Sequence, residues 1–224
     1  MLYAIGDIHG ERERLDELLD KLPLGTDDRL VFIGDYVDRG PDSRGVIDRL
    51  IRLEKERPCT FLIGNHESMF LDFLGWTNPT CFAGDAFLMN GGDRTLVSYE
   101  YFDSDLEPTE FQLPASHTKF FEGLKLHYRE GDYLFVHAGL NRAALECDDV
   151  DYALRNVNTE DILWNRTTAD IPHKLGITIV YGHTPANDLE VRWNSPFSIG
   201  IDTGAVYGGK LTALRLPDET LFQV

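Results

Sequence analysis

A short apolar run that leads directly into a polar loop constrains the fold of this chain more than any other feature. Residues 30–33 are all apolar, and the loop 34–40 that follows them contains Asp35, Asp38 and Arg39. Loops at the ends of buried strands carry the chemistry of α/β proteins. Two carboxylates and an arginine within five residues suit a hard cation and a phosphate, although an Asp-rich turn can also simply cap the next helix.

The same order of strand and polar loop occurs before and after this segment. Residues 2–5 lead into Gly6, and residues 61–63 lead into Gly64. Leucines at helical spacing follow the first loop, and Asp42 is a candidate cap for a second helix. Because the carboxyl ends of parallel strands meet at one edge of a sheet, we expect the polar side chains of the three loops to converge there. These side chains are Asp7, His9, Asp35, Asp38, Asn65 and His66.

The second half of the chain predicts further strands. Two β-rich runs end directly before His137 and His183, and the runs 211–216 and 221–224 flank a turn in the manner of a hairpin. We therefore predict an α/β fold of two packed mixed sheets flanked by helices. Residues 1–224 are expected to form a single domain.

Residues 68–132 are the least regular part of the sequence, because aromatic residues mix there with glycine and acids. Residues 90–93 indicate a tight turn before another helical stretch. The acidic segment 103–107 is typical of a solvated face, since it lacks the glycine and terminal glutamate of an EF-hand calcium loop. We expect this variable region, 68–132, to rim the functional cleft.

The composition excludes several classes of partner. The net charge is −17 and the sequence pI is about 4.7, so the surface repels nucleic acid and anionic membranes. No apolar stretch approaches a membrane span. Cys59, Cys81 and Cys147 form no CxxC pair, which favours reduced thiols. The first residues lack the pattern of a signal peptide, and we expect a cytoplasmic protein.

The residue types at the strand ends are those that hard divalent cations select: carboxylate, amide oxygen and imidazole. This inventory fits two metal ions better than one. Ions about 4 Å apart can hold a shared hydroxide and orient a phosphoryl group for in-line attack. A lone histidine is more often a structural residue, but five coincident motifs argue against that here. The expected ligands are Asp7 and His9 at one ion, Asn65, His137 and His183 at the other, and Asp35 as the bridge.

The remaining polar residues of these loops are candidates for proton transfer and phosphate binding rather than for metal binding. His66 adjoins Asn65 but points the other way in an extended segment, and Asp38 would keep its imidazole protonated as a general acid. Arg39 offers a planar fork for two phosphate oxygens. A surface salt bridge is the alternative for this arginine.

Five segments, in this order, resemble the signature of the phosphoprotein phosphatase family of calcineurin-like metallophosphoesterases. They are Gly6-Asp7-Ile8-His9-Gly10, Gly34-Asp35-Tyr36-Val37-Asp38-Arg39-Gly40, Gly64-Asn65-His66-Glu67, His137-Ala138-Gly139 and Gly182-His183. The resemblance implies a four-layer α/β/β/α sandwich and a dinuclear site of two divalent ions, usually manganese, or iron with zinc. It also implies attack by a hydroxide that bridges the metals.

The resemblance also assigns residues to roles. Asp35 corresponds to the bridging ligand, His66 with Asp38 to the general acid pair, and Arg39 to a phosphate-binding residue. A second phosphate-binding arginine usually lies between the last two histidines, where Trp164-Asn165-Arg166 looks like its carrier. The alternatives in the same interval are Arg142 and Arg155.

Two branches of the family fit this sequence. The turn 90–92 and the segment 201–209 are similar to those of bacterial protein phosphatases and of symmetrical diadenosine tetraphosphatases. Glu67 favours the protein phosphatases, since the dinucleotide enzymes commonly have aspartate there. Asp38 agrees, because the dinucleotide branch often departs from the Asp-Arg-Gly pattern.

The net charge of the chain also favours the protein phosphatases. A chain of net charge −17 does not favour long polyanions, so positive potential should be confined to the metals, Arg39 and Arg166. We therefore predict hydrolysis of phosphorylated proteins or peptides, of serine/threonine or dual specificity, with inorganic phosphate as the product. An inactive phosphate-binding module is disfavoured, because every predicted ligand is present. The aromatic residues of the variable region include Trp76, Phe82, Phe87 and Tyr99. Such residues lie in the core more often than they form platforms on which bases stack.

Overall fold

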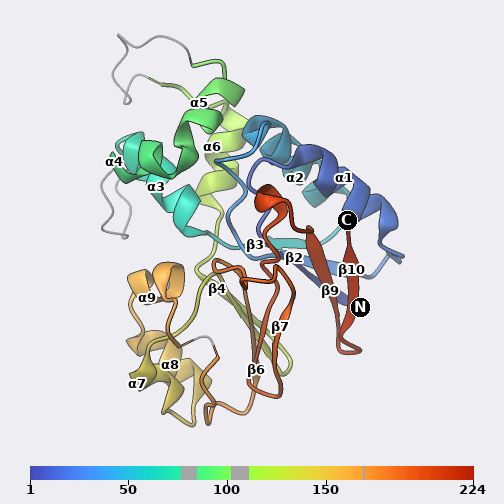
Figure 1. Cartoon of the computed structure of the whole chain (residues 1–224), viewed down its shortest axis with the longest axis vertical. Coiled ribbons are helices and arrows are strands. Elements are labelled where there is room, and N and C mark those ends of the chain that lie inside the picture. The colour runs from blue at the N-terminus through green and yellow to red at the C-terminus, as the bar shows by residue number, and fades with distance from the viewer. Residues whose placement is uncertain (77–84, 102–110, 169) are drawn as a thin grey trace.

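The computed structural model describes residues 1–76, 85–101, 111–168 and 170–224. Figure 1 shows two sheets side by side, with helices on their outer sides. The elements are β1 (Leu2–Ile5), α1 (Arg12–Lys21), β2 (Arg29–Phe32), α2 (Ser43–Glu56), β3 (Cys59–Phe61), α3 (Asn65–Phe73), α4 (Asp85–Phe87), η1 (Leu88–Gly92), α5 (Asp93–Ser98), α6 (Ala115–Glu122), β4 (His127–Glu130), β5 (Tyr133–Val136), α7 (Arg142–Leu145), α8 (Val150–Asn156), α9 (Thr159–Trp164), β6 (Thr178–Tyr181), β7 (Arg192–Asn194), β8 (Ser198–Gly200), η3 (Ala205–Tyr207), β9 (Thr212–Leu216) and β10 (Thr220–Gln223).

Both sheets are mixed and contain parallel and antiparallel strand pairs. The first has the strand order β10-β9-β1-β2-β3, and the second has the order β4-β5-β6-β8-β7. Strands β1, β2 and β3 are parallel, and β9 and β10 form the predicted hairpin beside them. In the second sheet β5, β6 and β8 are parallel, whereas β4 and β7 are antiparallel edges. The predicted α/β/β/α sandwich of two mixed sheets is therefore confirmed.

The central strands are apolar on both faces because both faces are covered. Tyr3 and Ile5 of β1 belong to the core cluster that packs against the helices, whereas Leu2 and Ala4 belong to a second cluster formed by the strands of both sheets. Successive side chains of a strand point to opposite faces. One four-residue strand thus contributes to two cores, which explains why the sequence reads as a continuous apolar run.

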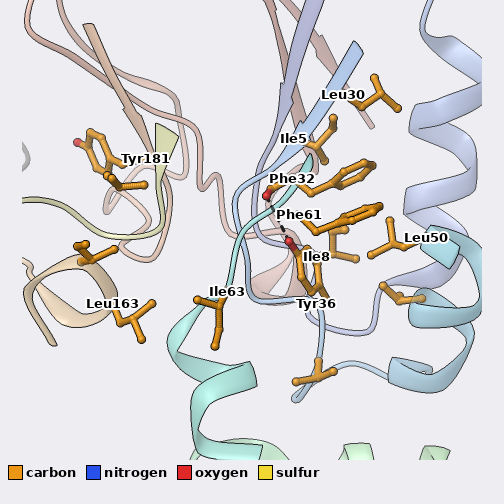
Figure 2. Packing of buried hydrophobic residues seen from close by; sticks show 14 of the residues in the cluster. Ile5, Ile8, Leu30, Phe32, Tyr36, Leu50, Phe61, Ile63, Leu163 and Tyr181 are labelled. Carbon is orange, nitrogen blue, oxygen red and sulfur yellow. Dashed lines mark hydrogen bonds between the residues drawn. The ribbon is translucent and has the colours of Figure 1, made fainter. Parts of the chain in front are cut away.

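The loop 34–40 is anchored in the helix-facing core (Figure 2). Tyr36 is fully buried, and its hydroxyl donates to the carbonyl oxygen of Leu62 at 2.6 Å and lies 3.2 Å from that of Phe32. Phe61 stacks on Phe32 with ring centroids 5.2 Å apart. The loop backbone is therefore fixed to the sheet, which holds its carboxylates in defined directions.

The first two strand and helix units follow the sequence prediction, whereas the third strand, expected at residues 61–63, spans Cys59–Phe61. Asp42 caps α2 by accepting a backbone N–H of its first turn at 2.8 Å. Strand β3 ends at Phe61, and the chain enters α3 at Asn65, so the extended conformation expected at His66 is wrong. The physical reason is the Glu67 side chain, which accepts the N–H that precedes this first turn at 2.9 Å and stabilises the helix start.

The described part of the variable region 68–132 is mainly helical. The predicted turn lies in η1, where Gly91 adopts a φ of 92°. Phe87 and Tyr99 are buried, as expected for core aromatics, whereas Phe82 and the acidic segment 103–107 lie outside the described residues. Among the helices of the described ranges, none combines the length and apolarity needed to cross a membrane.

Candidate metal centre

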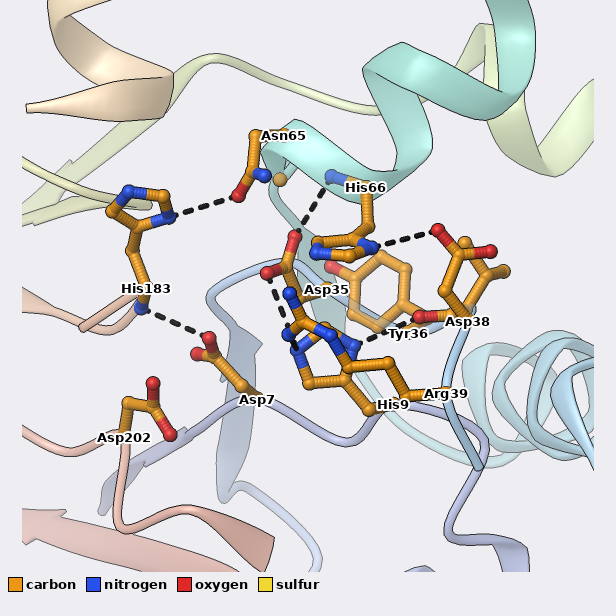
Figure 3. A network of polar contacts seen from close by, with 12 residues as sticks. Asp7, His9, Asp35, Tyr36, Asp38, Arg39, Asn65, His66, His183 and Asp202 are labelled. Atoms are coloured by element: carbon orange, nitrogen blue, oxygen red, sulfur yellow. Dashed lines mark hydrogen bonds and ion pairs between the residues drawn. The ribbon is translucent and has the colours of Figure 1, made fainter. Parts of the chain in front are cut away.

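Polar side chains from five strand-end loops meet at one edge of the two sheets (Figure 3). All six side chains that the sequence predicts as metal ligands are buried. Each of them follows one of the parallel strands directly or within a few residues, so these strands bring them to the same place. They are Asp7 and His9 after β1, Asp35 after β2, Asn65 after β3, His137 after β5 and His183 after β6.

The backbone at this edge is held in a conformation that L-residues rarely adopt. Of the eight described non-glycine residues with φ between 46° and 73°, five lie at this edge. Left-handed backbone is uncommon outside glycine and concentrates at functional sites, where the surrounding structure holds it. Four of the five belong to the first two loops, which therefore use strained turns to direct their side chains inward. The residues are His9, Asp35, Asp38, Arg39 and His183.

Two glycines make the close approach of these loops possible. A Cβ atom on Gly64 would lie 2.1 Å from Asp35 Oδ1, and one on Gly182 would lie 2.1 Å from Asp7 Oδ1. Any side chain at either position would displace a carboxylate. The glycines that end the apolar runs in the sequence thus have a direct role in forming the cluster.

Asp35 occupies the centre of the cluster. Its Oδ2 lies 3.5 Å from His9 Nε2, and its Oδ1 lies 3.3 Å from His137 Nε2. Two groups of side chains have ligand atoms within 4.8 Å of one another, and Asp35 belongs to both. One group adds His9 and His66, and the other adds His137 and His183. This position fits a carboxylate shared between two cations.

The hydrogen bonds at His137 direct its second ring nitrogen toward the cluster. His137 Nδ1 donates to the carbonyl oxygen of Ile33 at 2.8 Å, and its Nε2 lies 2.9 Å from Asn65 Oδ1. Burial acts to lower the pKa of His137, but the carboxylate of Asp35 raises it above its ordinary value, which favours a proton on Nε2 in the protein alone. A cation that takes the place of this proton would contact the same two atoms.

Two buried atoms of the cluster have no hydrogen-bond partner among the described residues, and both are electron-pair donors. They are Asp7 Oδ1 and His183 Nε2. His183 Nδ1 contacts Asn65 Oδ1 at 2.8 Å, so its proton lies there and the Nε2 lone pair is available. Buried polar atoms normally have partners. These donors therefore fit divalent cations.

The electrostatics of the cluster indicate a deficit of positive charge. Burial, with the carboxylates of Asp202 and Asp35, raises the pKa of Asp7 well above its ordinary value. Burial also lowers the pKa of His183 to about 2. Burial acts to raise the pKa of Asp35 as well, but the charges of His137 and His66 lower it well below its ordinary value. A cation would stabilise the ionised carboxylates and the neutral imidazoles together.

Asp202 is a buried carboxylate of this site to which the sequence analysis assigned no role. It follows β8, and Figure 3 places it beside Asp7. Its Oδ1 accepts the N–H of Gly204 at 3.0 Å, and burial raises its pKa to about 6. The sequence contains a signal for this residue, because residues 198–201 form another strand-like run directly before Asp202. It is the same order of strand and polar loop as at Asp7.

The structure joins His66 to Asp38 as expected, but not in the expected protonation state. His66 Nδ1 lies 2.7 Å from Asp38 Oδ2, and both side chains are buried. Burial lowers the pKa of His66 to about 4 and raises that of Asp38 well above its ordinary value. The expected protonation of His66 by Asp38 is therefore not favoured in the protein alone, since burial disfavours both charges.

A threonine from the variable region supports this pair. Thr95 of α5 donates its hydroxyl to Asp38 Oδ1 at 2.6 Å and accepts the Asp38 N–H at 2.8 Å. Thr95 is fully buried. Sequence reasoning did not identify it, because a single threonine in an irregular segment gives no signal until α5 packs against the loop 34–40.

The two predicted arginines lie on different sides of the cluster. Arg39 Nη1 donates to His9 Nε2 at 2.7 Å, and His9 is one of the expected metal ligands. Arg166 follows α9, is exposed, and lies 3.4 Å from the Thr184 hydroxyl, next to His183. Its charge lowers the pKa of both His66 and His183. In the described ranges, no contact connects the exposed alternatives with the cluster, namely Arg142 and Arg155.

Glu67 holds the backbone of the central loop. Its Oε1 accepts the N–H groups of Tyr36 at 2.7 Å and Val37 at 3.2 Å, and its Oε2 accepts those of Asp35 at 2.8 Å and Gly64 at 2.9 Å. The side chain is fully buried. Its carboxylate thus fixes the loop that carries Asp35, a role independent of any substrate.

Comparisons with known proteins agree with this geometry. A family model described as calcineurin-like phosphoesterase matches residues 2–208. The asymmetrical bis(5′-nucleosyl)-tetraphosphatase PrpE of Anoxybacillus flavithermus is 31% identical over 97% of this chain and 91% of its own length. PrpE of Oceanobacillus iheyensis is 34% identical over 98% of this chain and 90% of its own length. A crystal structure of a proposed diadenosine tetraphosphatase superimposes with a TM-score of 0.70 over 100% of this chain and 92% of its own chain. The two sequences are 23% identical, so this comparison shows a likeness of fold alone.

Proposed function

Since the chain belongs to the calcineurin-like phosphoesterase family, we propose that it hydrolyses dinucleoside tetraphosphates and cleaves them asymmetrically. The observation that carries this proposal is the similarity, over nearly the whole chain, to two relatives that are named for this activity. It replaces the preference for phosphoproteins that the sequence suggested. That preference rested partly on Glu67, which binds four backbone N–H groups.

The donors of the cluster suit two divalent cations. We assign Asp7 and His9 to one ion and Asp35 to both. When bound, the cations supply the positive charge that lowers the pKa of water and neutralises the phosphoryl oxygens. Manganese is the proposed metal, with iron and zinc as alternatives, because the set combines carboxylate and amide oxygens with imidazoles. The second ion takes Asn65, His137 and His183.

The other side chains have roles of their own in this proposal. Arg39 and Arg166 bind phosphoryl oxygens from different sides of the cluster. His66 delivers a proton to the leaving oxygen from Nε2, and its Nδ1 receives a proton in return from Asp38, whose pKa is raised by burial. The proton matters most when the leaving group is an alkoxide, and less when it is a polyphosphate.

A phosphoprotein phosphatase is the second candidate function, and the distribution of cations favours it. Among the described residues, Arg39 and Arg166 are the arginines and lysines whose charge acts on the pKa values of the cluster. Lys125 instead lies 5.7 Å from the ring centre of Tyr128, and Arg129 pairs with Asp151. Such a small positive patch suits a single phosphoryl group.

A side-by-side measurement tests the proposal. Manganese-loaded enzyme should cleave diadenosine tetraphosphate with a kcat/KM at least tenfold above that of the best phosphoserine, phosphothreonine or phosphotyrosine peptide. Anion-exchange chromatography should separate equal amounts of ATP and AMP. Formation of ADP alone would mean symmetrical cleavage and would contradict the proposal. A phosphopeptide value tenfold above the dinucleotide value would support the second candidate instead.

A further inference from the structure

One exposed aromatic ring lies against the cluster, on a segment to which the proposed function assigns no residue. Tyr207 ends the short helix η3, and 56% of its surface is exposed. The turn around it is well held: the Tyr207 and Gly209 N–H groups both donate to the carbonyl oxygen of Gly204 at 2.9 Å. The ring is therefore presented to solvent from a fixed backbone.

The ring is in contact with a phosphate-binding residue. The guanidinium carbon of Arg39 lies 5.5 Å from the centre of the Tyr207 ring, within the range of a cation–π interaction. Arg39 is fixed from two other directions, because its N–H donates to the carbonyl oxygen of Gly91 at 3.0 Å and its Nη1 donates to His9 at 2.7 Å. Partial burial raises the pKa of Tyr207, with Arg39 acting against the shift and Asp202 adding to it. These neighbours place the ring at the rim of the cluster.

Among the described residues, the other aromatic side chains named for this region do not offer such a surface. Phe87 and Tyr99 are buried, and Trp76 packs against the core. Trp164 is partly buried and contacts His183 edge to face, with ring centroids 6.0 Å apart. For Tyr207, within the described ranges, Arg39 is the residue found over the ring. More than half of the surface of Tyr207 is exposed and can contact another planar group.

We propose that Tyr207 is the stacking platform for the nucleobase attached to the phosphoryl group that Arg39 binds. This inference rests on the proposed function and specifies its substrate site. Nucleobases stack on aromatic side chains in a manner that tolerates different bases. In a nucleotide one ribose separates the base from its α-phosphate. Because ring and guanidinium are in direct contact, the phosphate held by Arg39 is the α-phosphate, and cleavage there releases a nucleoside monophosphate.

The same geometry disfavours symmetrical cleavage. Hydrolysis between the two central phosphates would require the β-phosphate at Arg39. The base would then lie one phosphate farther from the guanidinium, beyond the ring that touches it. Tyr207 therefore links base recognition to the position of the bond that breaks.

A binding experiment separates base recognition from support of Arg39. Calorimetric titration of manganese-loaded enzyme with AMP and with orthophosphate should give a dissociation constant for AMP that is roughly 5- to 150-fold lower, the value of one stacked base. Tyr207→Leu should remove most of this ratio, and Tyr207→Phe and Tyr207→Trp should keep it. Tyr152→Leu is the matched control, since Tyr152 is 54% exposed on α8, away from the cluster.

Two results would overturn the inference. Unchanged dissociation constants for both AMP and orthophosphate in Tyr207→Leu would mean that the base binds elsewhere. Equal weakening of AMP and orthophosphate would mean that the ring only positions Arg39. The proposed function is judged separately, because it depends on whether the wild-type enzyme cleaves diadenosine tetraphosphate. If the wild-type enzyme does not cleave diadenosine tetraphosphate but binds AMP through Tyr207, the stacking role of Tyr207 stands and the proposed function is wrong.

Discussion

Replacing Glu67 by glutamine should destabilise the protein strongly although the two side chains have nearly the same shape. The carboxylate accepts four backbone N–H groups, two at each oxygen. In Glu67→Gln the amide oxygen can keep two of them, and the amide NH₂ faces the other two as a donor. Each buried donor left without a partner costs about 1–3 kcal/mol, so the expected loss is about 2–6 kcal/mol.

Urea unfolding followed by circular dichroism measures this loss. Burial and the charge of Asp35 raise the pKa of Glu67 to about 8, so at pH 9 the carboxylate is ionised and the cost of burying its charge offsets part of the expected loss. Glu17→Gln is the control, because Glu17 is exposed on α1 and its replacement should change the stability by less than about 0.5 kcal/mol. A loss below about 1 kcal/mol for Glu67→Gln would refute the reasoning, since the four N–H bonds to the carboxylate would then not outweigh the cost of burying its charge.

Three further predictions concern the cluster. Asp35→Asn should lower the content of both metal ions, measured by atomic emission after dialysis, because Asp35 lies in both groups of possible ligands; full retention of two ions would remove the bridge assignment. His66→Asn should lower turnover of a phosphoserine peptide by roughly two to four powers of ten, and turnover of p-nitrophenyl phosphate much less, since an acidic phenol hardly needs a proton; equal losses would give His66 another role. Arg166→Ala should raise the orthophosphate inhibition constant at least tenfold, whereas Arg142→Ala should not, and the reverse result would move the second phosphate contact to α7.

The sequence predicted the convergence of these side chains because they follow the strongest local signal in the chain. Asp7, Asp35 and His137 each come directly, or within three residues, after a central strand. A buried parallel strand reads as an apolar run, and its carboxyl end meets those of its neighbours. The convergence of these side chains therefore follows from topology. The roles assigned to them remain predictions.

The parts that could not be predicted depend on contacts between distant segments. Thr95 supports Asp38 only because α5 packs across the loop 34–40, 57 residues away in the chain. The protonation of His66 was misjudged for a similar reason. Its neighbour Asp38 is visible in sequence, but the burial that lowers the pKa of His66 to about 4 is a property of the whole fold.

Glu67 illustrates how a residue can be assigned to the wrong kind of role. Its side chain was used to choose between substrates, but it points into the backbone of the loop that carries Asp35. An aspartate at this position would be one methylene shorter and would need that backbone to move closer. A difference between glutamate and aspartate here therefore reports the geometry of the loop rather than the substrate.

Burial separates chemistry from recognition in this protein. The proposed metal ligands and the pair of Asp38 and His66 are buried, and strained turns, glycines and Glu67 hold their backbone. Tyr207 and Arg166, by contrast, are exposed at the rim. A substitution at the rim can alter substrate preference without dismantling the cluster, whereas a substitution inside it affects every substrate that needs the metals. Dinucleotide and phosphoprotein hydrolysis can therefore share one centre, and the difference between them should be sought at Tyr207 rather than among the buried residues.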